Sequence, residues 1–361
     1  MNEACEKLVH SRLDSAGLNK VLLPLGTKPS QPHIPIFVSK DIKTKSRVVL
    51  IFGESFQDLG ILAHRVLSGP GGVNKGSLVS IVEELQKQNS SSTDASPPGI
   101  IIANMGQTIW SPELKRPLTK MGATGAIMPS AVHGGMYIDE EKNRIPENRN
   151  EKEHVKYIFE KVVPAMVNDE AGVDILGLGD GADAVEEYLD WSVTWNRLQG
   201  KINCFAIVGG YHPVNELQCE GLKTFLREKA CAWSTSLDPL GTPISGPDGN
   251  PDTTAFTGHG CPVLSGGEEN FVERLLIHSH PHVLGWLQTV ALTEQEGGYK
   301  NPQAMFDITY ADQDTSGGDP DWSKWENLPL DQQCPDFGTP DPRLDLSAND
   351  RGSDGEDSDA D

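Results

Sequence analysis

Runs of hydrophobic residues alternate along this chain with segments of helical periodicity. The run at residues 47–52 is continuously apolar, which is typical of a strand buried on both sides of a parallel sheet. Further short runs predict strands at residues 99–104, 173–176 and 202–208. Between the runs, apolar residues recur at spacings of three and four, and these stretches predict amphipathic helices over 78–85, 155–163, 182–195 and 271–293. The alternation predicts an α/β fold with a doubly wound, mostly parallel sheet and helices on both faces.

The remaining segments do not follow this alternation. Residues 1–20 have apolar positions among charges and a stop at Gly17, and they predict an N-terminal helix. Residues 21–25 and 33–38 mix prolines with β-forming residues, which favours edge strands or extended segments over central strands. Residues 105–149 have no clear periodicity and are too long for an ordinary connection, so we expect an irregular, lid-like insertion.

The charge is distributed unevenly. The chain has 361 residues and a formal charge of −22, and residues 306–361 hold 16 acidic but only 3 basic side chains. Asp, Gly, Pro and Ser dominate this end, which has too few large apolar groups to order itself. The expected organisation is a helix over 1–20, a domain over 21–295 that contains the insertion, and a mostly disordered acidic tail over 296–361.

Composition also excludes several classes of protein. An acidic chain has no overall attraction for phosphate backbones, so direct binding of nucleic acid is not expected. No run of about 18 apolar residues occurs, so we expect no membrane-spanning helix. The six cysteines form no C-x-x-C pair, and His278 and His282 share a helix face without the glutamate of a zinc-protease motif. Neither a metal nor a cofactor is predicted.

The most distinctive local motif is GLGDGA at residues 177–182, which follows one predicted strand and opens a helix. One interpretation is a dinucleotide-binding fingerprint, but the next strand ends in Val-Gly-Gly without the acidic residue that binds ribose. Asp180 and Asp183 would also repel a pyrophosphate at the helix N-terminus. The other interpretation is a nucleophile elbow, G-x-S-x-G, in which Gly179 stands where the serine should be.

An elbow without serine lacks the oxygen that a catalytic triad needs, and the other triad positions are equally incomplete. Asp238 follows a predicted short strand and is a candidate for the acid, whereas no histidine occurs between residue 263 and His278. Other polar residues would remain near the carboxyl ends of the strands, where ligands bind in such sheets. The candidates for this residual pocket are Gly53, Glu54, Ser55, Asp180 and His212.

Several strings taken together resemble one known family. They are RVVLIFGESFQDLG at 47–60, EHVKYIF at 153–159, CAWSTSLDPL at 231–240 and CPVLSGG at 261–267. In order and spacing, the chain is similar over about residues 20–290 to the fungal Argonaute-binding protein two domain family, an α/β-hydrolase-like group. The first residues resemble the interior of a longer family pattern, so we expect that the chain is truncated.

The resemblance implies what the site and the protein do. Family members with an intact elbow carry serine at the position of Gly179, with the acid at Asp238 and the histidine at or near Phe271. Two of these three positions are lost here, so we expect a pseudo-hydrolase rather than an enzyme. The alternative is an active esterase or lipase with a non-standard nucleophile or base, such as Ser55 or His212.

The family also implies a cellular role. The resemblance implies that this chain acts in small-RNA (siRNA)-directed gene silencing and heterochromatin formation, in the nucleus and also in the cytoplasm. The implied partners are an Argonaute protein, other subunits of the silencing complex, and chromatin modifiers such as a histone deacetylase, with no direct contact to nucleic acid or membrane.

Overall fold

The structure is a computed structural model that describes residues 2–126, 134–253, 258–294 and 297–311. The chain divides after residue 311, and every described residue belongs to the first of its two units, Met1–Ala311. The second unit, Asp312–Asp361, contains most of the expected acidic tail and lies outside the described residues. The expectation of disorder there stays a prediction.

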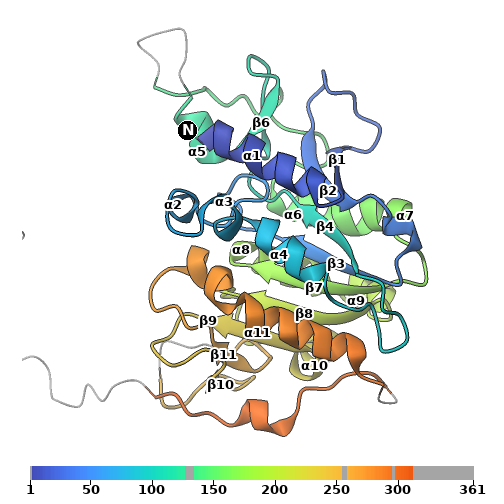
Figure 1. Cartoon of the computed structure of the whole chain (residues 1–361), viewed down its shortest axis with the longest axis vertical. Coiled ribbons are helices and arrows are strands. Elements are labelled where there is room, and N and C mark those ends of the chain that lie inside the picture. Colours follow the sequence, from blue (N-terminus) through green and yellow to red (C-terminus); the bar gives the residue numbers. More distant parts are fainter. Residues whose placement is uncertain (1, 127–133, 254–257, 295–296, 312–361) are drawn as a thin grey trace, which may run out of the picture. The chain divides into compact units, whose positions relative to one another are not determined.

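The described residues form one nine-stranded sheet and a small two-stranded one (Figure 1). The large sheet contains, in spatial order, β1 (Leu18–Leu23), β2 (Ile34–Ser39), β4 (Gly99–Ala103), β3 (Arg47–Phe52), β7 (Gly172–Leu178), β8 (Ile202–Val208), β9 (Ala230–Ser234), β11 (Val263–Ser265) and β10 (Pro243–Ser245). The six strands from β4 to β11 are parallel, and antiparallel neighbours lie at both edges. This sheet confirms the predicted mostly parallel, α/β-hydrolase-like fold.

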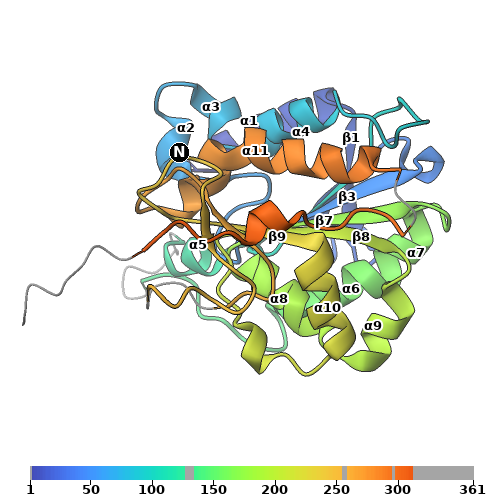
Figure 2. The same cartoon turned by 90° about the horizontal axis from the view of Figure 1, so that it is seen from below.

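Helices cover both faces of the sheet, as Figure 2 shows. One face carries α1 (Asn2–Ser15), α2 (His64–Leu67), α3 (Gly72–Lys75), α4 (Leu78–Leu85) and α11 (Val272–Leu292). The other carries α6 (Glu151–Tyr157), α7 (Val163–Met166), α8 (Asp180–Leu189), α9 (Ser192–Leu198) and α10 (Glu220–Lys229). Because the central strands are buried on both sides, two large apolar clusters form, one under each helical layer.

Two local features show how the sequence holds this architecture together. The side chain of Asn150 accepts a hydrogen bond from the Glu153 N–H at 2.9 Å, which caps α6. At the amino ends of β3 and β7, the Arg47 guanidinium lies 2.6 Å from the Asp174 carboxylate. Both side chains are buried, and Arg47 also donates to the Leu287 carbonyl, so this ion pair ties the sheet to α11.

The N-terminal segment differs from the prediction. The helix ends at Ser15 rather than at residue 20, because Gly17 adopts a φ of +89° and turns the chain into β1. Val9 and Leu13 are fully buried in the cluster beneath α4 and α11. The helix is therefore part of the domain, and the boundary predicted at residue 21 is wrong.

The two proline-containing segments both became strands, but only one is an edge strand. β2 lies between β1 and β4. It tolerates Pro35 because the ladder with β4 contains only Phe37 and Val38, so the missing N–H falls outside that ladder.

The structure also corrects the predictions for the insertion and for one helix. The insertion is not wholly irregular, since β5 (Ile109–Ser111) pairs with β6 (Arg116–Leu118) and a short helix, α5 (Lys120–Thr124), follows. The helix predicted over 182–195 is two helices, α8 and α9. The chain breaks at Asp190, whose carboxylate accepts the Cys219 N–H at 2.7 Å.

The domain also continues beyond residue 295. The Trp286 indole donates to the Tyr299 hydroxyl at 2.9 Å, and the Thr309 N–H donates to the Pro243 carbonyl at 3.1 Å. The Asn301 side chain donates to the Ala230 carbonyl at 2.7 Å. Residues 297–311 therefore belong to the folded unit and not to the tail.

Candidate functional site

The elbow motif lies where the sequence placed it, in the tight turn between β7 and α8. Gly179 has a φ of +51° and a ψ of −131°, a strained combination for residues other than glycine. A Cβ at Gly181 would lie 2.1 Å from the Gly53 carbonyl oxygen, and one at Gly177 would lie 2.6 Å from the Ala182 Cα. The glycines therefore let α8 pack directly against the end of β3.

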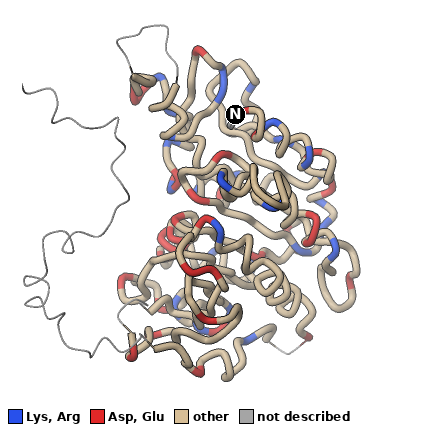
Figure 3. Tube along the Cα trace, turned by 60° about the vertical axis from the view of Figure 1, so that its left-hand side comes forward, with Lys and Arg blue, Asp and Glu red and all other residues tan. Residues whose placement is uncertain are grey.

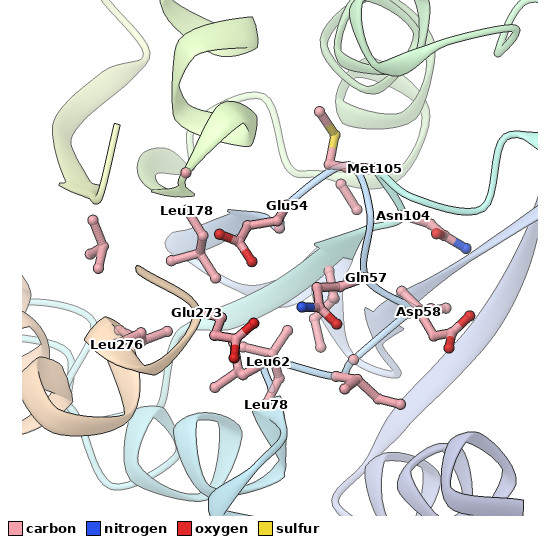
Figure 4. Close-up of a pocket in the computed structure, with 18 of the residues that line it drawn as sticks. Glu54, Gln57, Asp58, Leu62, Leu78, Asn104, Met105, Leu178, Glu273 and Leu276 are labelled. Atoms are coloured by element: carbon pink, nitrogen blue, oxygen red, sulfur yellow. The ribbon is translucent and has the colours of Figure 1, made fainter. Parts of the chain in front are cut away.

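A small cavity opens beside this turn at the carboxyl edge of the sheet. Its volume is about 30 Å³, which holds only one or two water molecules. The loops after β3 and β4, the elbow and the first turn of α11 line it, with polar or backbone groups from Gly53, Glu54, Gln57, Asp58, Asn104, Gly179 and Glu273. Figure 4 shows that Glu54 and Glu273 direct their carboxyl groups into the same space.

Glu54 occupies the place where an elbow nucleophile would project. A Cβ built on Gly179 would lie 2.9 Å from Glu54 Oε1 and 3.0 Å from its Cγ. The side chain is 8% exposed. Burial, with smaller contributions from Asp180 and Glu273, raises the pKa of Glu54 to about 7. The carboxyl group therefore fills the cavity and titrates near neutral pH.

Of the other sequence candidates, Gly53 lines this cavity, whereas Ser55, Asp180 and His212 do not. The Asp180 carboxylate accepts hydrogen bonds from the Ser55 N–H at 2.8 Å and from the Ser55 hydroxyl. The His212 N–H donates to Asp183 Oδ1 at 3.1 Å. Ser55 and Asp180 thus fix the β3 loop to the start of α8, and the backbone of His212 is fixed to the first turn of the same helix.

The two remaining triad positions lie after β9 and directly before α11. Asp238 follows β9, where its N–H donates to the Ser236 hydroxyl and its carbonyl accepts from Ser265 at 2.7 Å. Phe271 is the residue before α11 and is 38% exposed. The Arg65 guanidinium lies 4.4 Å from the centre of its ring, which is a cation–π contact. A phenyl ring cannot accept or donate the proton that a triad histidine transfers.

A buried hydrogen-bond network that the sequence did not reveal holds the far side of the cavity. The Gln107 amide donates to Glu6 Oε1 at 2.7 Å and to Asp58 Oδ1 at 3.1 Å. Asn104 donates to the Gln107 side chain at 2.9 Å, and the His154 ring accepts the Asn104 N–H at 3.1 Å. The network connects α1, α6 and the loops after β3 and β4, so it fixes the shape of the cavity.

The described residues contain neither a metal-site cluster nor a membrane-spanning helix. No group of three or more His, Cys, Asp or Glu side chains there has the geometry of a metal site. Among the described helices, none is long and apolar enough to cross a bilayer.

The order of the strands, the elbow turn and the cavity at the carboxyl edge of the sheet show that this chain has an α/β-hydrolase-like fold. The model of the Arb2 domain family matches residues 1–240, about two thirds of the sequence. This chain belongs to the Arb2 domain family.

Two solved structures are similar to this chain at low sequence identity. A thermostable esterase from Pseudomonas putida ECU1011 is similar with a TM-score of 0.34 and 8% identity, over 82% of this chain and 91% of that chain. A mutant of the esterase rPPE gives a TM-score of 0.33 and 9% identity over the same shares. No curated protein matches the sequence.

Proposed function

We propose that this chain is a non-catalytic member of the Arb2 domain family that acts by binding proteins of a silencing complex. The observation that carries the non-catalytic part is the pairing of Gly179 with Glu54. A general base activates only an oxygen that is present, and Gly179 has none. The Glu54 carboxyl group fills the space into which a serine side chain would project.

The family supports the rest of the proposal. The chain acts in siRNA-directed gene silencing and heterochromatin formation, as part of an Argonaute-associated complex in the nucleus and also in the cytoplasm. Its partners are an Argonaute protein and chromatin modifiers such as a histone deacetylase. RNA contact then passes through a partner, because this chain carries a net charge of −22.

The alternative, a hydrolase that uses Ser55 or His212, gains no support from the contacts in the described residues. The Ser55 hydroxyl donates to the Asp180 carboxylate, and neither Ser55 nor His212 lines the cavity. A nucleophilic serine needs, besides a base such as this carboxylate, an open space for the acyl group. The cavity of about 30 Å³ has no such space.

The test is affinity purification of the chain from nuclear and cytoplasmic extracts, with nuclease treatment and identification of bound proteins by mass spectrometry. We expect an Argonaute protein among the specific partners, retained after nuclease because the contact is protein to protein. The Ser55→Ala variant is the matched control and should retain the same partners. Recovery of metabolic enzymes alone, or loss of every partner on nuclease treatment, would contradict the proposal.

A further inference from the structure

Five large apolar side chains are exposed on the loops that leave the carboxyl ends of the parallel strands. They follow β3, β8, β9 and β11, and their exposed fractions lie between 38% and 64%: Phe56, Tyr211, Leu237, Leu240 and Phe271. Single exposed apolar residues are ordinary on a protein surface, whereas several on one edge indicate an interaction site. We call this set the carboxyl-edge surface.

Packing of the loops brings these side chains to one side of the molecule. A Cβ added at Gly209 would lie 2.5 Å from Val272 Cγ1. The loop that carries Tyr211 therefore packs against the start of α11, next to Phe271. A Cβ at Gly267 would lie 3.2 Å from Leu240 Cβ. Four strand spacings separate β3 from β11, which makes the surface about 19 Å wide.

The same loops carry charge of one sign. The segments 53–63, 179–183, 209–219, 235–242 and 266–271 contain no Lys or Arg. They contain eight acidic residues, of which Glu54 and Glu268 are buried; the other six are Asp58, Asp180, Asp183, Glu216, Asp238 and Glu269. Figure 3 marks the acidic and basic positions along the chain, with this side of the molecule turned forward.

The nearest cations belong to flanking helices and are already paired. The Arg65 guanidinium lies 2.5 Å from the Glu273 carboxylate, and Arg274 lies 3.2 Å from Glu268. Both guanidinium groups also lie over the Phe271 ring, at 4.4 Å and 5.6 Å from its centre. The surface therefore combines apolar contact area with an excess of negative charge.

We infer that the carboxyl-edge surface docks a basic peptide segment with apolar anchor residues, presented by a partner protein. This inference rests on the proposed function and names the chemistry of the partner. A helix rises 1.5 Å per residue, so about 13 residues span the 19 Å width. The apolar anchors cover the exposed rings and leucines, while lysines and arginines of the segment complement the acidic loops.

The charge argues against the other occupants of such a surface. Nucleic acid and anionic lipid carry the same sign and are repelled. A second copy of this chain docked through the same surface would place identical acidic loops against each other, and their charges would repel. A small-molecule ligand has no room, because the adjacent cavity measures about 30 Å³.

The first experiment uses a defined probe and the full chain. The probe is a fluorescent 18-residue helical peptide of leucine and lysine, compared with a peptide of the same charge in which serine replaces leucine. We expect the leucine peptide to bind at least tenfold more tightly than the serine peptide, as measured by fluorescence anisotropy. The tighter binding of the leucine peptide relative to the serine peptide should persist at high salt, because salt does not screen apolar contacts.

Variants locate the binding on the surface. The double substitution Tyr211→Ser with Leu237→Ser should weaken binding of the leucine peptide at least tenfold. Both side chains are 64% exposed, so their removal should affect folding little. The matched control is Trp191→Ser with Val193→Ser, which removes side chains that are 72% and 85% exposed at the start of α9. The control should bind within twofold of the unsubstituted chain. Equal binding by all three proteins would overturn the inference.

A second experiment separates this inference from the proposed function. A photo-crosslinking benzoylphenylalanine at position 237 is irradiated in the purified complexes, and the attached peptide is sequenced by mass spectrometry. We expect a net positive partner segment with leucine or aromatic residues. An acidic segment, a second copy of this chain or a nucleic acid overturns the inference. If the Tyr211 and Leu237 variant retains Argonaute at the unsubstituted level, the proposed function stands and the surface assignment fails.

Discussion

Glu54 and Gly179 are sterically complementary. The carboxyl group of Glu54 lies 2.9 Å from the position that a Cβ on Gly179 would take. The elbow keeps its backbone turn, with a φ of +51° at Gly179. The Glu54 side chain therefore occupies the space in front of the turn, and Gly179→Ser would place the new side chain against it.

Substitution of Gly179 tests this complementarity. We expect Gly179→Ser to lower the free energy of unfolding by about 1–3 kcal/mol, because a side chain at this backbone conformation is strained and would contact Glu54. Glu54→Ala should recover part of the loss in a double-mutant cycle measured by urea unfolding. Gly285→Ala is the control, since no atom lies within 4 Å of that added Cβ and the helical position gains about 0.5–1 kcal/mol. Simple additivity of the two substitutions would refute the contact.

The charge of Glu54 should limit stability at alkaline pH. Its pKa is raised to about 7, so the favourable protonated form is fully present below the unfolded value of 4.5 and is lost as the pH rises through 7. Glu54→Gln should therefore stabilise the protein by about 3 kcal/mol at pH 8 and have little effect below pH 4.5. Glu187→Gln, at an exposed ion pair with Lys152, should change little at either pH. A pH-independent effect of Glu54→Gln would contradict the raised pKa.

His154 should make the fold sensitive to acid. Its ring is fully buried between the Asn104 N–H and the Asn148 side chain, and burial lowers its pKa to about 3. The unfolded chain binds a proton near pH 6.5, so the stability is complete above that pH and falls as the pH decreases. We expect a loss of about 2 kcal/mol at pH 5 from this group.

The pH slope of the His154→Asn variant measures that loss directly. The variant should be less stable at pH 7 but should lose about 2 kcal/mol less than the unsubstituted chain between pH 7 and pH 5. His10 and His259, whose pKa values burial lowers to about 4, add to the acid sensitivity. An unchanged slope in the variant would show that His154 is not the titrating group.

Truncations test where the folded unit ends. A chain that stops at Ala311 should keep its thermal midpoint within about 2 °C. A chain that stops at Thr293 loses the hydrogen bonds of Tyr299 and Asn301 and should melt at least about 5 °C lower. A similar drop for both chains would place stabilising contacts beyond residue 311.

The strands and the elbow could be predicted because their signals are local. The apolar runs at 47–52 and 202–208 are β3 and β8, and the glycines of 177–182 mark the turn that α8 requires. Gly53 and Glu54 could be placed at the cavity because they follow a strand at the carboxyl edge. Each of these inferences needs only neighbouring residues.

The rest of the site could not be predicted because it depends on contacts between distant segments. Glu273 reaches the cavity from α11, and Gln107 joins Glu6 of α1 to Asp58. None of these residues has a local pattern that marks it. The position of the Glu54 side chain depends on how β3 and α8 pack, so the sequence indicated the missing serine but not what replaced it.

The central claim is that this hydrolase-like chain forms no covalent intermediate. The most direct measurement is intact-mass spectrometry of the full chain after incubation with a fluorophosphonate probe, with p-nitrophenyl ester turnover followed in parallel. We predict an unchanged mass and turnover at the buffer rate, because Gly179 supplies no oxygen. A probe adduct on Ser55, accompanied by ester turnover that Ser55→Ala abolishes, would contradict the account.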